Sequence, residues 1–360
     1  MQFRKALLTT HLWAGLLAAP FLLALGLTGA VMVFENEIDD ALNAKLTRVT
    51  SSGAALSLAA LESRIDSAYP GYRLVGAEFP ADERHAYAIA AAAPGGRDGA
   101  DLFVDQHTGR ILGTASEARP VMQSLHGFHT HLLAGRTGAA ILGWGSLLLV
   151  FLSVSGLILW WPAKVVRVRW GAPAKRLVFD LHNAVGAVSF VFLLVFAVTG
   201  AVIHWDVPAG QWLARLTRTA PMPAIPRAAQ DCRDQASLPA DRLLATAAAA
   251  VPGARATWLQ TPGGPSPVRV VFKYPEDHTP AGRTQVFLAG CTGRLLAVRS
   301  SRLAPAAIQY SSMWNREIHT GDLFGWPTRI LMCLFSLSLP VMAVTGPLIW
   351  WTRRGRGLPG

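Results

Sequence analysis

Four of the ten histidines form two pairs whose spacing and local sequence are repeated. His11 pairs with His182 and His129 pairs with His319, and the residues around one member of a pair recur at the same spacing around the other. A glycine stands four residues after each histidine of the first pair, on the same helical face as the imidazole, where it leaves space for a flat macrocycle. Neutral imidazole is a good axial ligand of haem iron, and two imidazoles give a six-coordinate centre suited to electron transfer. The repetition predicts two iron porphyrins, one held by His11 and His182 and the other by His129 and His319.

The predicted cofactor is haem b, two per chain, because the sequence lacks the Cys-x-x-Cys-His motif of covalent attachment. His126 lies one turn before His129 and corresponds to Arg316 in the second half, a position that suits pairing with a haem propionate. We expect His131 at the surface, and His204 either beside the second haem or at the membrane interface. Two alternatives remain open: a local zinc or copper cluster of His126, His129 and His131, or histidines that only bind headgroups and backbone.

Four apolar stretches must position these histidines. Hydrophobic residues make up 51% of the chain and charged residues 15%, whereas soluble chains usually carry about a quarter charged residues. The same composition excludes a disordered chain, and three cysteines are too few for a disulfide scaffold. Each stretch reaches the roughly 20 residues that a helix needs to cross a bilayer. The predicted spans are Leu12–Phe34, Ala139–Trp161, Leu181–Trp205 and Ile330–Trp351.

The basic residues lie mainly in the short segments that flank these spans. These segments contain ten basic residues and a single acidic residue, Asp180, which accounts for +9 of the net charge of +11. The ten basic residues are Arg4, Lys5, Lys164, Arg167, Arg169, Lys175, Arg176, Arg353, Arg354 and Arg356. The positive-inside rule then places both termini and the middle loop in the cytoplasm. The basic charge is therefore an orientation signal, and we predict membrane lipids, with no nucleic acid, as partners.

The two halves of the chain repeat one order of elements. Residues 101–113 read DLFVDQHTGRILG and residues 285–297 read QVFLAGCTGRLLA, which predicts strand, glycine turn and strand in each. Residues 58–68 and 238–249 have helical composition in equivalent places. We predict a membrane protein with a four-transmembrane-helix bundle that arose by internal duplication, and two small α/β domains outside the membrane.

The predicted domain boundaries follow from the spans and the orientation. They are a cytoplasmic N-terminus with the first helix (1–34), a first periplasmic domain (35–137), the second helix (138–161), a basic cytoplasmic loop (162–180), the third helix (181–205), a second periplasmic domain (206–329), the fourth helix (330–351) and a cytoplasmic tail (352–360). Cys232 and Cys291 both fall in the second periplasmic domain, where a disulfide is allowed. The sequence does not decide between a bridge and two separate thiols.

The chain resembles the PepSY-associated transmembrane family, which includes iron-regulated inner-membrane proteins and siderophore-iron reductases of the ferrioxamine reductase type. The resemblance covers nearly the whole chain. The resemblance rests on the following segments: His11 through Leu27-Thr28-Gly29-Ala30, the two Thr-Gly-Arg hairpins, the segment with His129, Gly135 and Gly138, Leu181-His182-Asn183, Thr199-Gly200 and the Trp-Trp pairs that end the second and fourth spans.

The resemblance implies a bacterial inner-membrane oxidoreductase that reduces Fe(III) held by a siderophore, so that Fe(II) is released in the periplasm. The sequence contains no flavin or nicotinamide motif, and electrons must therefore come from quinol or from a cytoplasmic reductase. An alternative from another class is a non-redox regulatory or binding protein, because PepSY-like domains are also associated with the modulation of peptidases.

Overall fold

The computed structural model describes residues 2–95, 99–118, 120–220, 222–227, 232, 235–279 and 281–354. It divides into two compact units. The helical unit comprises Met1–Glu35, Gln123–Trp212 and Trp314–Gly360, and the sheet unit comprises Asn36–Met122 and Leu213–Met313. Residues 355–360 of the predicted cytoplasmic tail, including Arg356, lie outside the described residues.

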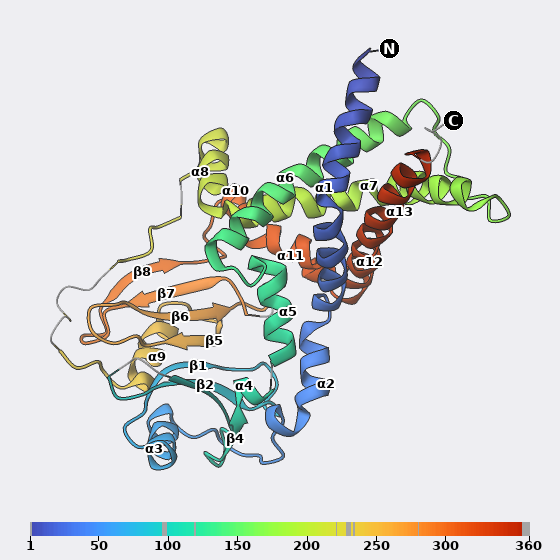
Figure 1. The fold of residues 1–360 in the computed structure, drawn as a ribbon. Helices are drawn as coiled ribbons and strands as arrows, with labels where there is room; N and C mark the ends of the chain where they lie inside the picture. Colours follow the sequence, from blue (N-terminus) through green and yellow to red (C-terminus); the bar gives the residue numbers. More distant parts are fainter. Residues whose placement is uncertain are drawn as a thin grey trace. The chain divides into compact units, whose positions relative to one another are not determined.

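Four long apolar helices form the helical unit (Figure 1). They are α1 (Gln2–Met32), α6 (Gly135–Trp160), α7 (Ala174–His204) and a fourth that consists of α12 (Trp326–Ser336) and α13 (Ser338–Arg354). Each is long and apolar enough to cross a membrane, which confirms the four predicted spans. Neighbours pack in the cyclic order α1, α6, α7, α13, around a core that includes Leu149, Leu193, Ala197 and Leu339.

All four long helices begin earlier than the apolar pattern indicated, and α1 and α7 differ from it the most. The first predicted span began at Leu12 and the third at Leu181, whereas α1 begins at Gln2 and α7 at Ala174. The added turns contain Lys and Arg, which are good helix formers and extend their charged ends to the membrane surface. As a result, His11 and His182 lie inside their helices and not at the first residue.

Short helices occur between the long elements in the sequence. In the helical unit, α5 (Pro120–His131) carries His129 and α11 (Asn315–Thr320) carries His319. Helix α11 follows a π-helical turn, η2 (Tyr310–Trp314), and ends at Gly321, whose φ of 88° suits glycine. The remaining short elements are α2 (Glu35–Thr47), α4 (Ala115–Ala118), α8 (Asp206–Thr217), α10 (Ala306–Gln309) and η3 (Asp322–Phe324).

The sheet unit contains one eight-stranded sheet in the order β4-β3-β2-β1-β5-β6-β7-β8 (Figure 1). The strands are β1 (Arg73–Glu78), β2 (Tyr87–Ala92), β3 (Gly99–Val104), β4 (Ile111–Thr114), β5 (Arg255–Gln260), β6 (Val268–Lys273), β7 (Thr284–Leu288) and β8 (Leu295–Arg299). All neighbouring strands are antiparallel. The predicted turns at Gly109 and Gly293 have φ of 75° and 72° and join β3 to β4 and β7 to β8.

The strands of the two predicted α/β domains therefore share one sheet. Each half supplies four consecutive strands, and β1 pairs with β5 through Gly76 and Gln260. Unpaired edge strands expose backbone N–H and C=O groups, and pairing β1 with β5 satisfies them. One face of the sheet packs against α3 (Leu58–Ala68) and α9 (Ala240–Ala249) through buried apolar residues of both halves. The order of elements is the same in both halves, while the internal duplication itself stays a prediction.

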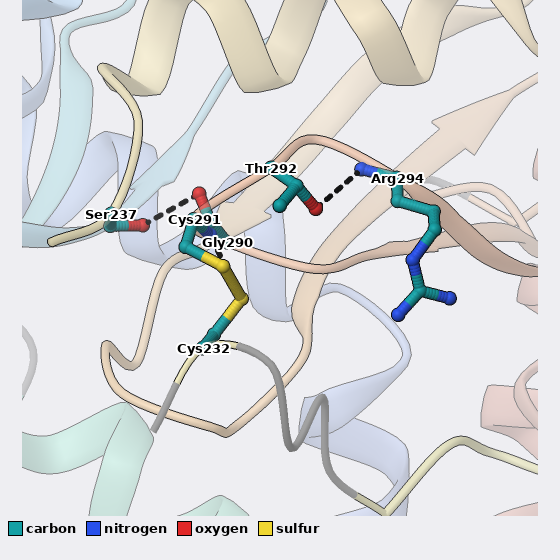
Figure 2. The surroundings of a disulfide bond; sticks show 6 residues. All are labelled: Cys232, Ser237, Gly290, Cys291, Thr292 and Arg294. Carbon is teal, nitrogen blue, oxygen red and sulfur yellow. Dashed lines mark hydrogen bonds between the residues drawn. A yellow bond between two sulfur atoms is a disulfide. The ribbon is translucent and has the colours of Figure 1, made fainter. Parts of the chain in front are cut away.

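A disulfide joins Cys232 to Cys291 in the sheet unit (Figure 2). The two Cα atoms lie 5.4 Å apart, and the bridge closes a segment with a sequence separation of 59 residues. The backbone N–H of Cys291 donates to the sulfur of Cys232 at 3.2 Å. The disulfide thus anchors the segment before α9 to the hairpin between β7 and β8, and it settles the pairing that the sequence left open.

Candidate functional site

Each of the four predicted histidines forms a hydrogen bond with a hydroxyl group of a different helix. The Nδ1 atom of His11 lies 2.7 Å from Ser155 Oγ on α6, and that of His182 lies 2.8 Å from Thr345 Oγ1 on α13. In the second pair, the Nδ1 atom of His129 lies 2.9 Å from Oγ1 of Thr28 on α1, and that of His319 lies 2.7 Å from Oγ1 of Thr199 on α7. The four imidazoles therefore share one mode of attachment.

The hydroxyl groups also determine which ring nitrogen holds the proton. Each hydroxyl donates its single proton to the carbonyl four residues earlier in its own helix, so it must accept from the Nδ1–H of the histidine. The hydroxyl-to-carbonyl distances are 2.6 Å for Ser155 to Phe151, 2.7 Å for Thr345 to Val341, 2.9 Å for Thr28 to Ala24 and 2.6 Å for Thr199 to Val195. The lone pair of each neutral imidazole is then on Nε2, the atom that can bind a metal.

A glycine directly follows each of the four hydroxyl residues and lies against the imidazole ring. A Cβ atom at Gly156 would be 3.4 Å from Cε1 of His11, and one at Gly346 would be 3.5 Å from Cε1 of His182. At Gly200 the corresponding distance to His319 is 3.6 Å, and at Gly29 the distance to His129 is 3.0 Å. The hydroxyl thus holds the ring at Nδ1, while the glycine lets the edge of the ring approach the helix backbone.

The hydroxyl residues obey the spacing of the sequence repeat. Thr28 and Thr199 are as far apart in the chain as the two histidines of the first pair, and Ser155 and Thr345 are as far apart as those of the second pair. Thr28 and Thr199 belong to the repeat that the sequence revealed. Ser155 and Thr345 were missed, although each directly precedes a repeated glycine, because one is serine and the other threonine.

The glycines four residues after His11 and His182 have neighbours other than these imidazoles. A Cβ at Gly15 would meet only Leu152, at 3.9 Å, among neighbours within 4 Å. A Cβ at Gly186 would lie 3.0 Å from Cε of Met342. The glycines that flank the imidazoles come instead from the partner helix, which a single-helix pattern cannot reveal. The role of Gly15 and Gly186 in making space for a macrocycle stays a prediction.

The second pair occupies a buried environment that keeps the imidazoles neutral. Burial, with a smaller effect of the charge of His126, lowers the pKa of His129 to about 4. Burial, together with the charges of His129 and Arg316, lowers the pKa of His319 to about 3. His129 is thus near enough to His319 to influence its pKa. Neutral imidazole is the form that binds iron.

The three other histidines considered near this region have different partners. His126 faces Glu35, with 3.3 Å between Nδ1 and Oε2, and His131 is exposed and bonds the Gly127 carbonyl at 3.0 Å. His204 lies against Gly143 and packs edge-on to Trp205, with ring centroids 4.7 Å apart. Within the described ranges, no three His, Cys, Asp or Glu residues gather as metal ligands.

The donor chemistry of each pair suits a bis-histidine haem. The donor set is two neutral imidazoles with Nε2 as the available nitrogen, and the rings are anchored at Nδ1, as histidine ligands of metals almost always are. The surrounding helices are apolar, which suits a non-covalent macrocycle. The first pair lies in the first third of α1 and α7, and the second pair meets these helices near their last turns.

Comparison with known proteins identifies one family. The model of the PepSY-associated TM region matches residues 8–353, which is nearly the whole chain, and this confirms the resemblance seen in the sequence. No curated protein matches the chain.

Proposed function

The chain belongs to the family of the PepSY-associated TM region, and from this premise we propose that it is a di-haem b electron-transfer protein of the bacterial inner membrane. The observation that carries the proposal is the set of four imidazoles anchored to hydroxyl groups at Nδ1, with Nε2 left as the metal-binding nitrogen. A purely structural histidine has no need of this arrangement four times in one chain.

His11 and His182 would hold one haem, and His129 and His319 the other. A bis-imidazole haem supplies reversible one-electron transfer. The protein residues supply position: the four hydroxyl groups fix the ring orientation, and the four flanking glycines admit the rings to the helix surface. Anchoring of this kind also raises the basicity of the ligand, which tunes the metal.

The two pairs lie at different depths of the bundle. His11 and Thr28, the anchor of the second pair, both lie on α1, and the helical rise of about 1.5 Å per residue separates them by about 26 Å along the helix axis. This distance is close to the thickness of the hydrocarbon core, about 30 Å. The two predicted haems would therefore lie near opposite surfaces of the membrane, as a transmembrane electron carrier requires.

We further propose the direction and the partners. The positive-inside rule puts both termini, and with them the His11 and His182 pair, on the cytoplasmic side. Electrons would be supplied by quinol or by a cytoplasmic reductase, and the acceptor would be ferric iron bound to a siderophore in the periplasm. Reduction to Fe(II), which siderophores hold more weakly, releases the metal. The activity proposed is that of a haem-dependent ferric-siderophore reductase.

Haem quantification on the purified full-length protein tests the proposal. We expect about two haem b per chain and a reduced-minus-oxidised spectrum of the bis-histidine type. His182→Ala and His319→Ala should each remove about half of the haem, whereas His131→Ala, which alters an exposed ring bonded to its own helix, should remove none. Colourless protein from haem-replete cells would reject electron transfer and favour the regulatory class.

A further inference from the structure

One face of the second half of the sheet is rich in basic and hydrogen-bond-donating side chains. Val268, Val270 and Phe272 of β6 point into the core under α3 and α9, so the alternate residues Arg269 and Lys273 lie on the opposite face. Strand register places further residues on this face: Trp258 pairs with Val271, Val271 with Gln285, and Gln285 with Arg299. We call this set the basic face, and it consists of Trp258, Arg269, Lys273, Gln285 and Arg299.

The first half of the sheet has alanine at the equivalent basic positions. Ala88 pairs with Phe103 as Arg269 pairs with Phe287, so Ala88 is equivalent to Arg269 and Ala92 to Lys273. Ala115 is equivalent to Arg299, because the two residues are as far apart in the chain as the two Thr-Gly-Arg turns. Ala88 and Ala115 belong to an apolar cluster with Val49, Ala86 and Phe103. Each half has a buried phenylalanine on this face, Phe103 in the first and Phe287 in the second, but the positions that carry Arg269, Lys273 and Arg299 in the second half carry alanine in the first.

Two donors on the basic face are buried without an acceptor. In the portion of the chain that the structure describes, Nε of Arg269 and Nε1 of Trp258 are inaccessible to solvent and have no hydrogen-bond partner. Gln285 receives a hydrogen bond from Arg299 at 3.4 Å. Register places a carboxylate, Glu78, beside Trp258. Buried donors without acceptors cost free energy, and both groups would gain an acceptor if ligand binding drew their side chains towards the ligand.

We propose that the basic face binds an anionic chelate of ferric iron, one whose oxygen ligands carry the negative charge. The inference rests on the proposed function, which supplies a ferric acceptor as substrate, and it adds the charge class of that acceptor. Guanidinium groups donate strong, charge-assisted hydrogen bonds to anionic oxygen atoms. Trp258 offers an aromatic surface on the same face as these guanidinium groups, which matches the ring of a catecholate ligand. The difference between the two halves, alanine in the first and basic residues in the second, is explained if only the second half binds the ligand.

Binding of a redox-inert probe to the purified full-length protein tests this assignment. The probe is gallium(III) tris-catecholate, with a neutral gallium(III) tris-hydroxamate as its matched comparison, measured by calorimetry. We expect the anionic probe to bind more tightly. Raising the ionic strength from about 0.1 M to about 1 M, which shortens the Debye length from about 10 Å to about 3 Å, should weaken its binding in the unaltered protein.

Substitutions locate the site. Arg269→Gln and Arg299→Gln should each weaken binding of the anionic probe by about tenfold, the effect of losing one hydrogen bond between charged groups, and Arg269→Lys should restore part of it. Arg242→Gln is the matched control, because Arg242 is exposed on α9, which packs on the opposite face. Haem content should be unchanged in all four variants.

Three results would overturn the assignment. They are equal binding of both probes, full affinity in Arg269→Gln and Arg299→Gln, or displacement of the probe by an equal concentration of inorganic phosphate, which would indicate a general anion site. Each could occur in protein that holds two haems, so these failures are distinguishable from failure of the proposed function. Colourless protein that still binds the anionic probe through Arg269 would instead reject electron transfer while it keeps the anion site.

Discussion

Removal of one hydroxyl group tests the anchoring of the second pair most directly. Thr199→Val deletes the acceptor that lies 2.7 Å from Nδ1 of His319 and replaces it with a methyl group of similar size. The carbonyl of Val195, to which the hydroxyl also donates, still has its ordinary helical N–H partner. The substitution therefore leaves a buried imidazole N–H without an acceptor and changes little else.

The expected magnitude follows from the burial of His319. A buried donor left without its acceptor costs about 1–3 kcal/mol, and about 1.4 kcal/mol corresponds to a factor of ten. Haem held by His129 and His319 should then bind about 5-fold to about 150-fold more weakly. Loss of a hydrogen bond behind a metal ligand typically weakens metal binding by about 10-fold to about 100-fold, which agrees with this range.

The assay is the transfer of haem from the purified protein to an excess of apomyoglobin, followed by absorbance. About half of the haem in Thr199→Val should transfer faster than in the unaltered protein, and the other half, held by His11 and His182, should not change. Ser189→Ala is the matched control, because Ser189 is buried on the same helix and its hydroxyl donates to the Val185 carbonyl at 2.6 Å. Equal transfer from Thr199→Val and the unaltered protein would refute the anchoring argument.

Three further predictions concern other contacts. Gly29→Ala should lower haem content more than Gly346→Ala, because the new Cβ lies 3.0 Å from His129 in the first and 3.5 Å from His182 in the second; equal content in both would contradict this. Hydrogen bonding to Arg48 holds the pKa of Asp40 at about 2, below its usual 3.8. Because this pKa is lowered by folding, the ionised carboxylate stabilises the fold above about pH 4, and the stabilisation is lost as the pH falls towards 2. Asp40→Asn should accordingly lower the Tm at pH 7, and the difference should close near pH 2; a gap that is constant with pH would exclude the ion pair as its cause. Cys232→Ser should lower the Tm of the full chain, because removing the bridge costs up to about 4 kcal/mol of stability for a loop of this length. A Tm that is the same in the variant and the unaltered protein, under both reducing and oxidising conditions, would contradict a stabilising role of the disulfide.

The sequence alone was sufficient for the features that depend on local pattern. Runs of apolar residues predicted four membrane spans, because crossing the hydrocarbon requires about 20 such residues whatever the rest of the chain does. The turns at Gly109 and Gly293 were predictable because positive φ favours glycine. The family, too, followed from residues that are contiguous or repeated at a fixed spacing. Where polar turns extend α1 and α7, the apolar pattern had no signal, and the predicted starts came too late.

Contacts between distant segments were decided only by the tertiary structure. The hydroxyl partners of His11 and His182 lie 144 and 163 residues away in the chain, and a helical pattern places residues on a face without naming the face opposite. The sheet gives the same lesson: each half reads as its own four-stranded unit, and the pairing of β1 with β5 depends on two edges that meet only after folding. Sequence spacing thus predicted the four imidazoles as candidate ligands, whereas the packing of the helices determined which nitrogen of each ring donates to a neighbouring hydroxyl group.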